Sequence, residues 1–111
     1  KADTLFSEFN GALSENYVAQ VLTNLNDSLY YWTSENTAKI DFILQHELEV
    51  LPVEVKAGES RRKKSLLVYN EKYKPKLLLR TSARNLKQDE DLCNIPLYLM
   101  SEIHSLILMG K

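Results

Sequence analysis

"PVEVKAG", residues 52–58, has the alternation of a buried β-strand but carries two charges. Successive side chains of a strand point to opposite faces, so the apolar ones share a face: Val53, Val55 and Ala57. Glu54 and Lys56 share the other face. Because an unpaired buried charge is costly, this second face predicts partners for both residues rather than a plain core strand.

The segments around this strand predict an α/β fold. Helices are expected over residues 9–27, 61–73 and 100–109, with Asn10-Gly11 starting the first and Ser60 capping the second. Strands are expected over residues 28–34, 38–44, 48–57, 75–82 and 93–99, with a loop at 87–92 and an irregular or edge beginning at Pro52. The order α-β-β-β-α-β-β-α predicts a central mixed β-sheet flanked by helices.

Composition narrows the class of protein. The 111 residues are the size of one domain, with 44% hydrophobic and 26% charged residues. A net charge of −1 gives no overall field that attracts nucleic acid or a membrane surface, so such binding needs a local patch. The single cysteine, Cys93, and the lack of a long apolar run favour a cytoplasmic protein without membrane helices. Because the chain starts at Lys1 rather than Met, we expect it to be part of a longer protein.

Glu15 is a charge in an apolar setting. Its helical neighbours at three, four and seven residues are small or apolar, so it lies on the face that should meet the sheet. A carboxylate buried there needs a hydrogen bond, a cation or a proton. Two interpretations remain open: Glu15 belongs to a site, or it pairs with a lysine or caps a backbone group.

Asp41 is expected to face Glu54. Alternation in the second strand places Ile40, Phe42 and Leu44 on one face and Lys39, Asp41 and Ile43 on the other. If the hairpin turns around residues 47–48, Asp41 lies opposite Glu54 at a Cβ separation of about 5 Å, where like charges repel. A divalent cation relieves the repulsion, and carboxylates, a backbone carbonyl and water suit Mg²⁺ or Mn²⁺.

Lys56 points at the same place. An ammonium there can orient an attacking water or stabilise charge on a phosphoryl oxygen. The alternative is an ordinary ion pair of Lys56 with Asp41 or Glu54.

The ordered set Glu15, Asp41, Glu54 and Lys56 resembles the PD-(D/E)XK nuclease superfamily: a helical acid, an Asp on one strand, and Glu-x-Lys on the next. A longer set of sequence segments is similar to the C-terminal domain, of unknown function, of a large group of prokaryotic AAA+ ATPases. The segments that carry this likeness are "GALSENYVAQVL", "LYYW", "KIDFIL", "LPVEVKAG", "KSLLVYNEKYKP" and "NIPLYL". Two positions depart from the usual pattern: Ile40 replaces the Pro, and Lys39 stands where a Glu is common.

The resemblance implies a restriction-endonuclease-like core over residues 1–111, a single nuclease-like domain behind an ATPase domain of the same protein. It implies that Asp41, Glu54 and the Val55 carbonyl bind Mg²⁺ or Mn²⁺, with Lys56 as the catalytic lysine and Glu15 as an auxiliary acid. The expected activity is a metal-dependent DNA phosphodiesterase. The alternative is a non-catalytic module of the same fold that binds nucleic acid or regulates the ATPase.

A basic run follows the Glu-x-Lys strand and predicts contacts with DNA phosphates: Arg61, Arg62, Lys63 and Lys64. The alternative is a solvated charge run, with the helix beginning only near Ser65.

Aromatic residues of the first strand are capable of stacking on unpaired bases: Tyr30, Tyr31 and Trp32. We interpret them instead as core and edge packing of that strand. His46 and His104 lie far apart in the sequence, and neither is assigned a role.

Overall fold

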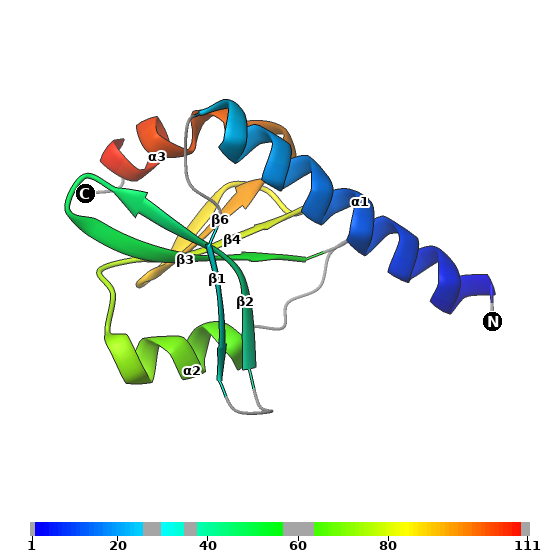
Figure 1. The fold of residues 1–111 in the computed structure, drawn as a ribbon. Coiled ribbons are helices and arrows are strands. Elements are labelled where there is room, and N and C mark those ends of the chain that lie inside the picture. The colour runs from blue at the N-terminus through cyan, green and yellow to red at the C-terminus, as the bar shows by residue number, and fades with distance from the viewer. Residues whose placement is uncertain (1, 26–29, 35–37, 57–63, 110–111) are drawn as a thin grey trace.

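The computed structural model describes residues 2–25, 30–34, 38–56 and 64–109, with only the backbone described for residues 2–10. The predicted α/β fold is confirmed: a six-stranded mixed sheet is flanked by helices. Helices α1 and α3 lie on one side of the sheet and α2 lies on the other (Figure 1). In the described part of the chain, no helix is both long and apolar enough to cross a membrane.

The helices are α1 (Ala2–Asn24), α2 (Lys64–Tyr73), the 3-10 helix η1 (Leu97–Glu102) and α3 (Ile103–Met109). The strands are β1 (Tyr30–Ser34), β2 (Ala38–His46), β3 (Glu49–Val55), β4 (Leu78–Ser82), β5 (Lys87–Asp89) and β6 (Leu92–Pro96). Their order in the sheet is β1-β2-β3-β4-β6-β5. β3, β4 and β6 run parallel, whereas the other neighbours are antiparallel. The chain passes from β3 through α2 to β4, as a parallel pair requires.

Each face of the sheet has its own core. The core under α1 and α3 contains Val18, Leu22, Leu44, Leu51, Val53, Val55, Leu79, Cys93, Ile95, Met100, Ile103 and Ile107. The core under α2 contains Ile40, Leu66, Tyr69, Leu78 and Leu92, with Trp32 and Ile43 packed against it. Because both faces of the interior strands are covered, polar side chains on them stand out as candidates for function.

The predicted hairpin is confirmed. β2 and β3 pair with His46 opposite Glu49, so the turn is Glu47-Leu48, and pairing continues to Phe42 opposite Val53. Continuing this register by one step places Asp41 opposite Glu54, as expected.

A bulge interrupts β2 on its other side, next to β1. The register there is Tyr30↔Ile43 and then Trp32↔Ile40. Tyr31 therefore faces both Asp41 and Phe42, and two residues opposite one is the count of a β-bulge.

The bulge makes the predicted alternation of β2 wrong at Ile40. Ile40 and Ile43 both belong to the α2 side, whereas Phe42 packs on the α1 side. Asp41 also reaches the α1 side, because it shares a hydrogen bond with Glu15 of α1. The extra residue shifts the side-chain period by one, which a strict alternation cannot anticipate.

Several predicted element ends are wrong. α1 begins at Ala2 rather than at Asn10-Gly11, and the backbone of its first turns projects beyond the sheet (Figure 1). The predicted loop at 87–92 contains β5, whose polar residues lack strand periodicity and form a strand by pairing with β6. The last predicted strand ends at Pro96, and η1 follows it.

Pro52 lies in an interior strand, but at a place where its missing N–H costs little. β3 pairs with β2 from Glu49 onwards, whereas parallel pairing with β4 begins only at Val53. α2 begins at Lys64, close to the alternative predicted start near Ser65. Ser60 lies outside the described residues.

Two adjacent leucines of α2 give a matched test of this core. Leu66 is fully buried and Leu67 is half exposed. We expect Leu66→Ala to lower the free energy of unfolding by about 2–5 kcal/mol, because it leaves a cavity between α2 and the sheet. Leu67→Ala should cost less than about 1 kcal/mol. Urea unfolding followed by circular dichroism measures both, and equal losses would contradict the packing described here.

Candidate functional site

Asp41 lies where β2 and β3 separate. Backbone pairing between these strands ends at Phe42 and Val53. One step further, Asp41 Oδ2 accepts a hydrogen bond of 2.8 Å from the Val55 backbone N–H. This side-chain hydrogen bond replaces the next backbone hydrogen bond between the strands. The carboxylate lies between β2 and β3, where groups from both faces of the sheet can contact it.

Glu54 and Lys56 reach this place from β3. Glu54 is buried, and the Lys56 ammonium lies 3.5 Å from its Oε2. The Asp41 and Glu54 side chains lie close enough to raise the pKa of Asp41. On the other flank, Lys39 Nζ lies 3.9 Å from Asp41 Oδ1. Two carboxyl groups and two ammonium groups therefore meet at the carboxyl end of β3.

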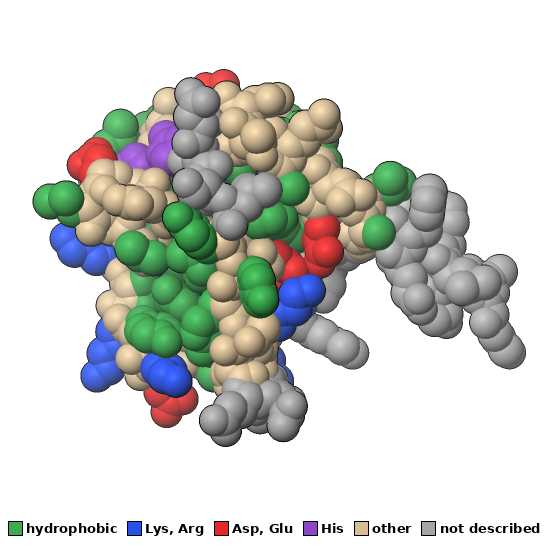
Figure 2. Space-filling model, in the orientation of Figure 1, with side chains coloured by type: hydrophobic (Ala, Val, Ile, Leu, Met, Phe, Trp, Pro, Cys, Tyr) green, Lys and Arg blue, Asp and Glu red, His purple; other side chains and the backbone are tan. Residues whose placement is uncertain are grey.

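Glu15 completes the group from α1, which passes above the end of β3 (Figure 1). A hydrogen bond to Asp41, then burial, then the negative charge of Asp41 raise the pKa of Glu15, while Lys39 and Lys56 lower it. The structure thus brings together all four residues singled out by the sequence: Glu15, Asp41, Glu54 and Lys56. In Figure 2 acidic and basic side chains meet beneath the middle of α1.

Burial and neighbouring carboxyl groups set the protonation of Asp41. Burial, followed by the hydrogen bond shared with Glu54, raises the pKa of Asp41 to about 6. Hydrogen bonds from Glu15 and from the Val55 N–H oppose this shift. Near neutral pH the site therefore holds closely spaced oxygen ligands whose negative charge is only partly compensated by two lysines.

The remaining predicted site residues are less well placed. Arg61, Arg62 and Lys63 lie outside the described residues, and Lys64 is an exposed residue at the start of α2. Within the described ranges, no group of three or more His, Cys, Asp and Glu side chains is already arranged to hold a metal ion. The ligand set expected from the sequence differs from such a group, because it combines two carboxylates with the Val55 carbonyl.

The aromatic residues of β1 divide into two kinds. Trp32 is a packing residue, as interpreted: its ring makes edge contacts with Tyr69 at 5.2 Å and with Tyr73 at 6.0 Å. Tyr30 and Tyr31 are not packed, because they are 61% and 72% exposed. Because β1 is an edge strand, the core part of the interpretation holds for Trp32, whereas Tyr30 and Tyr31 lie exposed at the edge.

Sequence reasoning missed a polar row beside the site. Arg80 of β4 pairs in register with Glu54 on one side and with Asn94 of β6 on the other, and all three are buried. Arg80 Nε donates to Asn94 Oδ1 at 3.1 Å, and Ser82 Oγ donates to the same oxygen at 2.8 Å. Burial, then the charge of Arg84, lower the pKa of Arg80. A cation inside the apolar run "LLLRTS" was the available signal.

Two histidines without a predicted role meet at the far end of β2. The rings of His46 and His104 stack with centroids 4.9 Å apart, and their Nδ1 atoms lie 2.7 Å apart. His46 Nε2 lies 3.5 Å from Glu47 Oε2. Five residues of extended chain, about 17 Å, separate His46 from Asp41. The histidine pair is therefore not part of the carboxyl cluster, which consists of Glu15, Asp41 and Glu54.

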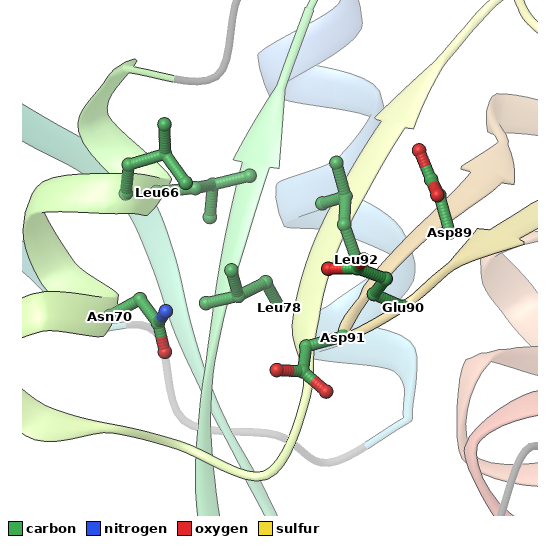
Figure 3. A pocket seen from close by; sticks show the side chains of 8 residues that line it. Leu66, Asn70, Leu78, Asp89, Glu90, Asp91 and Leu92 are labelled. Atoms are coloured by element: carbon green, nitrogen blue, oxygen red, sulfur yellow. The ribbon is translucent and has the colours of Figure 1, made fainter.

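A pocket of about 100 Å³ lies between α2 and the β5–β6 turn (Figure 3). Its lining residues are Leu66, Leu67, Asn70, Leu78, Asp89, Glu90, Asp91 and Leu92. Leu78 and Leu92 begin β4 and β6, so the pocket lies at the amino ends of these strands. The carboxyl cluster lies at the opposite, carboxyl end of β3, where ligands of open α/β sheets usually bind.

The chain matches the model of a known family. The model of the family described as "Domain of unknown function (DUF4143)" matches residues 10–100. No curated protein and no solved structure matches the chain. The matched range includes the three acids of the carboxyl cluster and Lys56.

The raised pKa of Asp41 predicts an unusual dependence of stability on pH. A carboxyl group with a folded pKa of about 6 and an ordinary value of 3.8 binds more protons in the folded state between these pH values. Stability should therefore fall as pH rises from about 4 to about 6, by on the order of 1–2 kcal/mol after solvent screening is considered. Asp41→Asn keeps an acceptor for the Val55 N–H and should flatten this part of the profile.

Urea unfolding at a series of pH values tests this prediction. The control is Asp89→Asn, an exposed aspartate of β5, which should retain the fall seen in the unaltered protein. An Asp41→Asn profile that still falls by the same amount would show that the crowding of carboxyl groups does not act through Asp41.

Proposed function

Because this chain belongs to the family of domains of unknown function DUF4143, we propose a function from its site: a Mg²⁺- or Mn²⁺-dependent phosphodiesterase acting on DNA. The observation that carries the proposal is the convergence of Asp41, Glu54 and Lys56 at the fork between β2 and β3, with Glu15 above it. Three acids and a lysine from α1, β2 and the end of β3 have no need to meet in a merely stable fold, because burying them together is costly.

The residues present fit a hard divalent cation. The donors are all oxygens, from Asp41, Glu54 and the Val55 carbonyl, and hard cations prefer such ligands. Burial and the neighbouring Glu54 raise the pKa of Asp41 to about 6, so a cation bound beside this carboxyl group would stabilise its charged form. A bound Mg²⁺ or Mn²⁺ would supply a Lewis acid that polarises the phosphodiester.

The side chains have separate roles in this proposal. Hydrolysis adds water across a P–O ester bond: the water oxygen bonds to phosphorus, and the ester oxygen leaves and takes up a proton. Lys56 is partly exposed and can donate hydrogen bonds to the water or to the phosphoryl oxygen that gains charge. Glu15, whose pKa is raised, can hold a proton near the site. The Arg80–Asn94 pair holds β4 and β6 in place beside it.

One observation favours a second candidate, a non-catalytic module that binds DNA or contacts an ATPase part of a longer protein. Lys39 and Lys56 already compensate Asp41 and Glu54, so the cluster is tolerable without a cation. In that case the acids and lysines would hold α1 on the sheet rather than act on a substrate.

Metal binding separates the two candidates. We expect Mn²⁺ or Mg²⁺ to raise the free energy of unfolding by about 2.7 kcal/mol at a hundred times its dissociation constant, and more at pH 7.5 than at pH 5, because protons compete for the carboxylates. Asp41→Asn and Glu54→Gln should lose this gain, whereas Asp89→Asn should keep it. Stability that does not respond to either metal at pH 7.5 would contradict the metal site.

Cleavage tests the catalytic lysine. Lys56→Ala should reduce metal-dependent cutting of a DNA panel of linear, branched and single-stranded substrates by at least roughly a hundredfold, because a donor to the developing charge is lost. Lys87→Ala, an exposed lysine of β5, is the matched control and should cut like the unaltered protein. Metal stabilisation should persist in Lys56→Ala, which excludes unfolding as the cause. Equal activity of both variants would remove Lys56 from the mechanism.

A further inference from the structure

An exposed aromatic ring stands beside the carboxyl cluster. Tyr31 lies in the edge strand β1 and is 72% exposed. Large aromatic side chains usually bury much of their area, whereas the ring of Tyr31 is exposed to solvent.

The register fixes where the Tyr31 ring points. Trp32 turns to the α2 side, where it packs on Tyr69. Because neighbouring side chains of a strand take opposite faces, Tyr31 turns to the α1 side. Its partners across the ladder are Asp41 and Phe42 of the bulge; Phe42 packs on the α1 side, and the Asp41 carboxyl group interacts with Glu15 from that side. Side chains opposite one another on the same face have Cβ atoms about 5 Å apart.

A lysine lies on the same surface. Lys39 is 63% exposed, and its ammonium is 3.9 Å from Asp41 Oδ1. Thr33, the cross-strand partner of Lys39, is two residues from Tyr31 and therefore shares its face. An aromatic face, a solvated cation and the carboxyl cluster thus follow one another along the β1–β2 edge.

We propose that Tyr31 is a stacking platform for an unpaired base, with Lys39 contacting a neighbouring phosphate, so that the site takes DNA with a single-stranded segment. This inference rests on the proposed function and narrows its substrate class. A duplex keeps the faces of its bases stacked inside the helix, whereas a single strand can lay one base on the tyrosine ring. The combination of an aromatic face with a cation matches a nucleotide better than it matches an apolar protein segment, which would leave Lys39 without a counterpart.

Binding without metal tests the platform independently of cleavage. Fluorescence anisotropy is measured with a labelled oligo-dT strand and with a blunt hairpin duplex, in EDTA and at low salt. Tyr31→Ala should weaken binding of the single strand roughly tenfold or more and leave duplex binding within about twofold. Tyr31→Phe keeps the ring and should bind like the unaltered protein.

Two tyrosines serve as matched controls. Tyr98 of η1 is 74% exposed but follows β6, away from β1, and Tyr30 is exposed on the opposite face of β1. Alanine at either position should change single-strand affinity less than about threefold. An oligomer of abasic sites should bind the unaltered protein as weakly as oligo-dT binds Tyr31→Ala, because either change removes the same stacked pair.

Clear results would overturn the platform. These are undetectable binding of oligo-dT by the unaltered protein, affinity unchanged in Tyr31→Ala, or equal losses for single strand and duplex. A change of oligomeric state in Tyr31→Ala without a change in DNA affinity would instead assign the edge strand to protein contacts. If Tyr31-dependent binding is found but no metal-dependent cutting, the platform stands and the proposed activity fails. If cutting is found without dependence on Tyr31, the activity stands and the platform fails.

Discussion

The hydrogen bond from the Val55 N–H to Asp41 Oδ2 is the contact around which the site is built. It replaces a backbone–backbone hydrogen bond with a side-chain one at the point where β2 leaves β3. The two strands can therefore diverge without leaving the Val55 N–H unpaired. The Asp41 carboxylate between the two strands can be contacted from both faces of the sheet. Glu15 therefore meets it from the α1 side, while Glu54 and Lys56 meet it from β3.

This arrangement stores electrostatic strain in an otherwise apolar fold. Three carboxyl groups share one small volume, and burial raises the pKa of Asp41 to about 6. Two lysines compensate part of the charge, at distances of 3.5 Å and 3.9 Å that are typical of loose ion pairs. Replacing a buried charged cluster with apolar side chains is often neutral or stabilising, so the stability of the fold does not by itself require these charges.

The bulge in β2 links the site to the sheet edge. By placing Asp41 and Phe42 against the single residue Tyr31, it turns Asp41 toward α1 and leaves an exposed aromatic ring next to it. The same local irregularity thus aims the acid and sets its surroundings. On the interior side, the row of Glu54, Arg80 and Asn94 continues the polar surface across the parallel strands.

The sequence alone determined the α/β fold, the β2–β3 hairpin and the four residues that converge, because charges in apolar alternation and the ExK spacing are local signals. It did not determine the faces of β2, the role of Arg80 or the exposure of Tyr31. A one-residue bulge reverses which face a side chain takes, and the alternation of residues in the sequence does not show whether a bulge is present. Whether a tyrosine is packed or exposed depends on its strand lying at the edge of the sheet, and strand order is set by long-range pairing that only the tertiary structure decides.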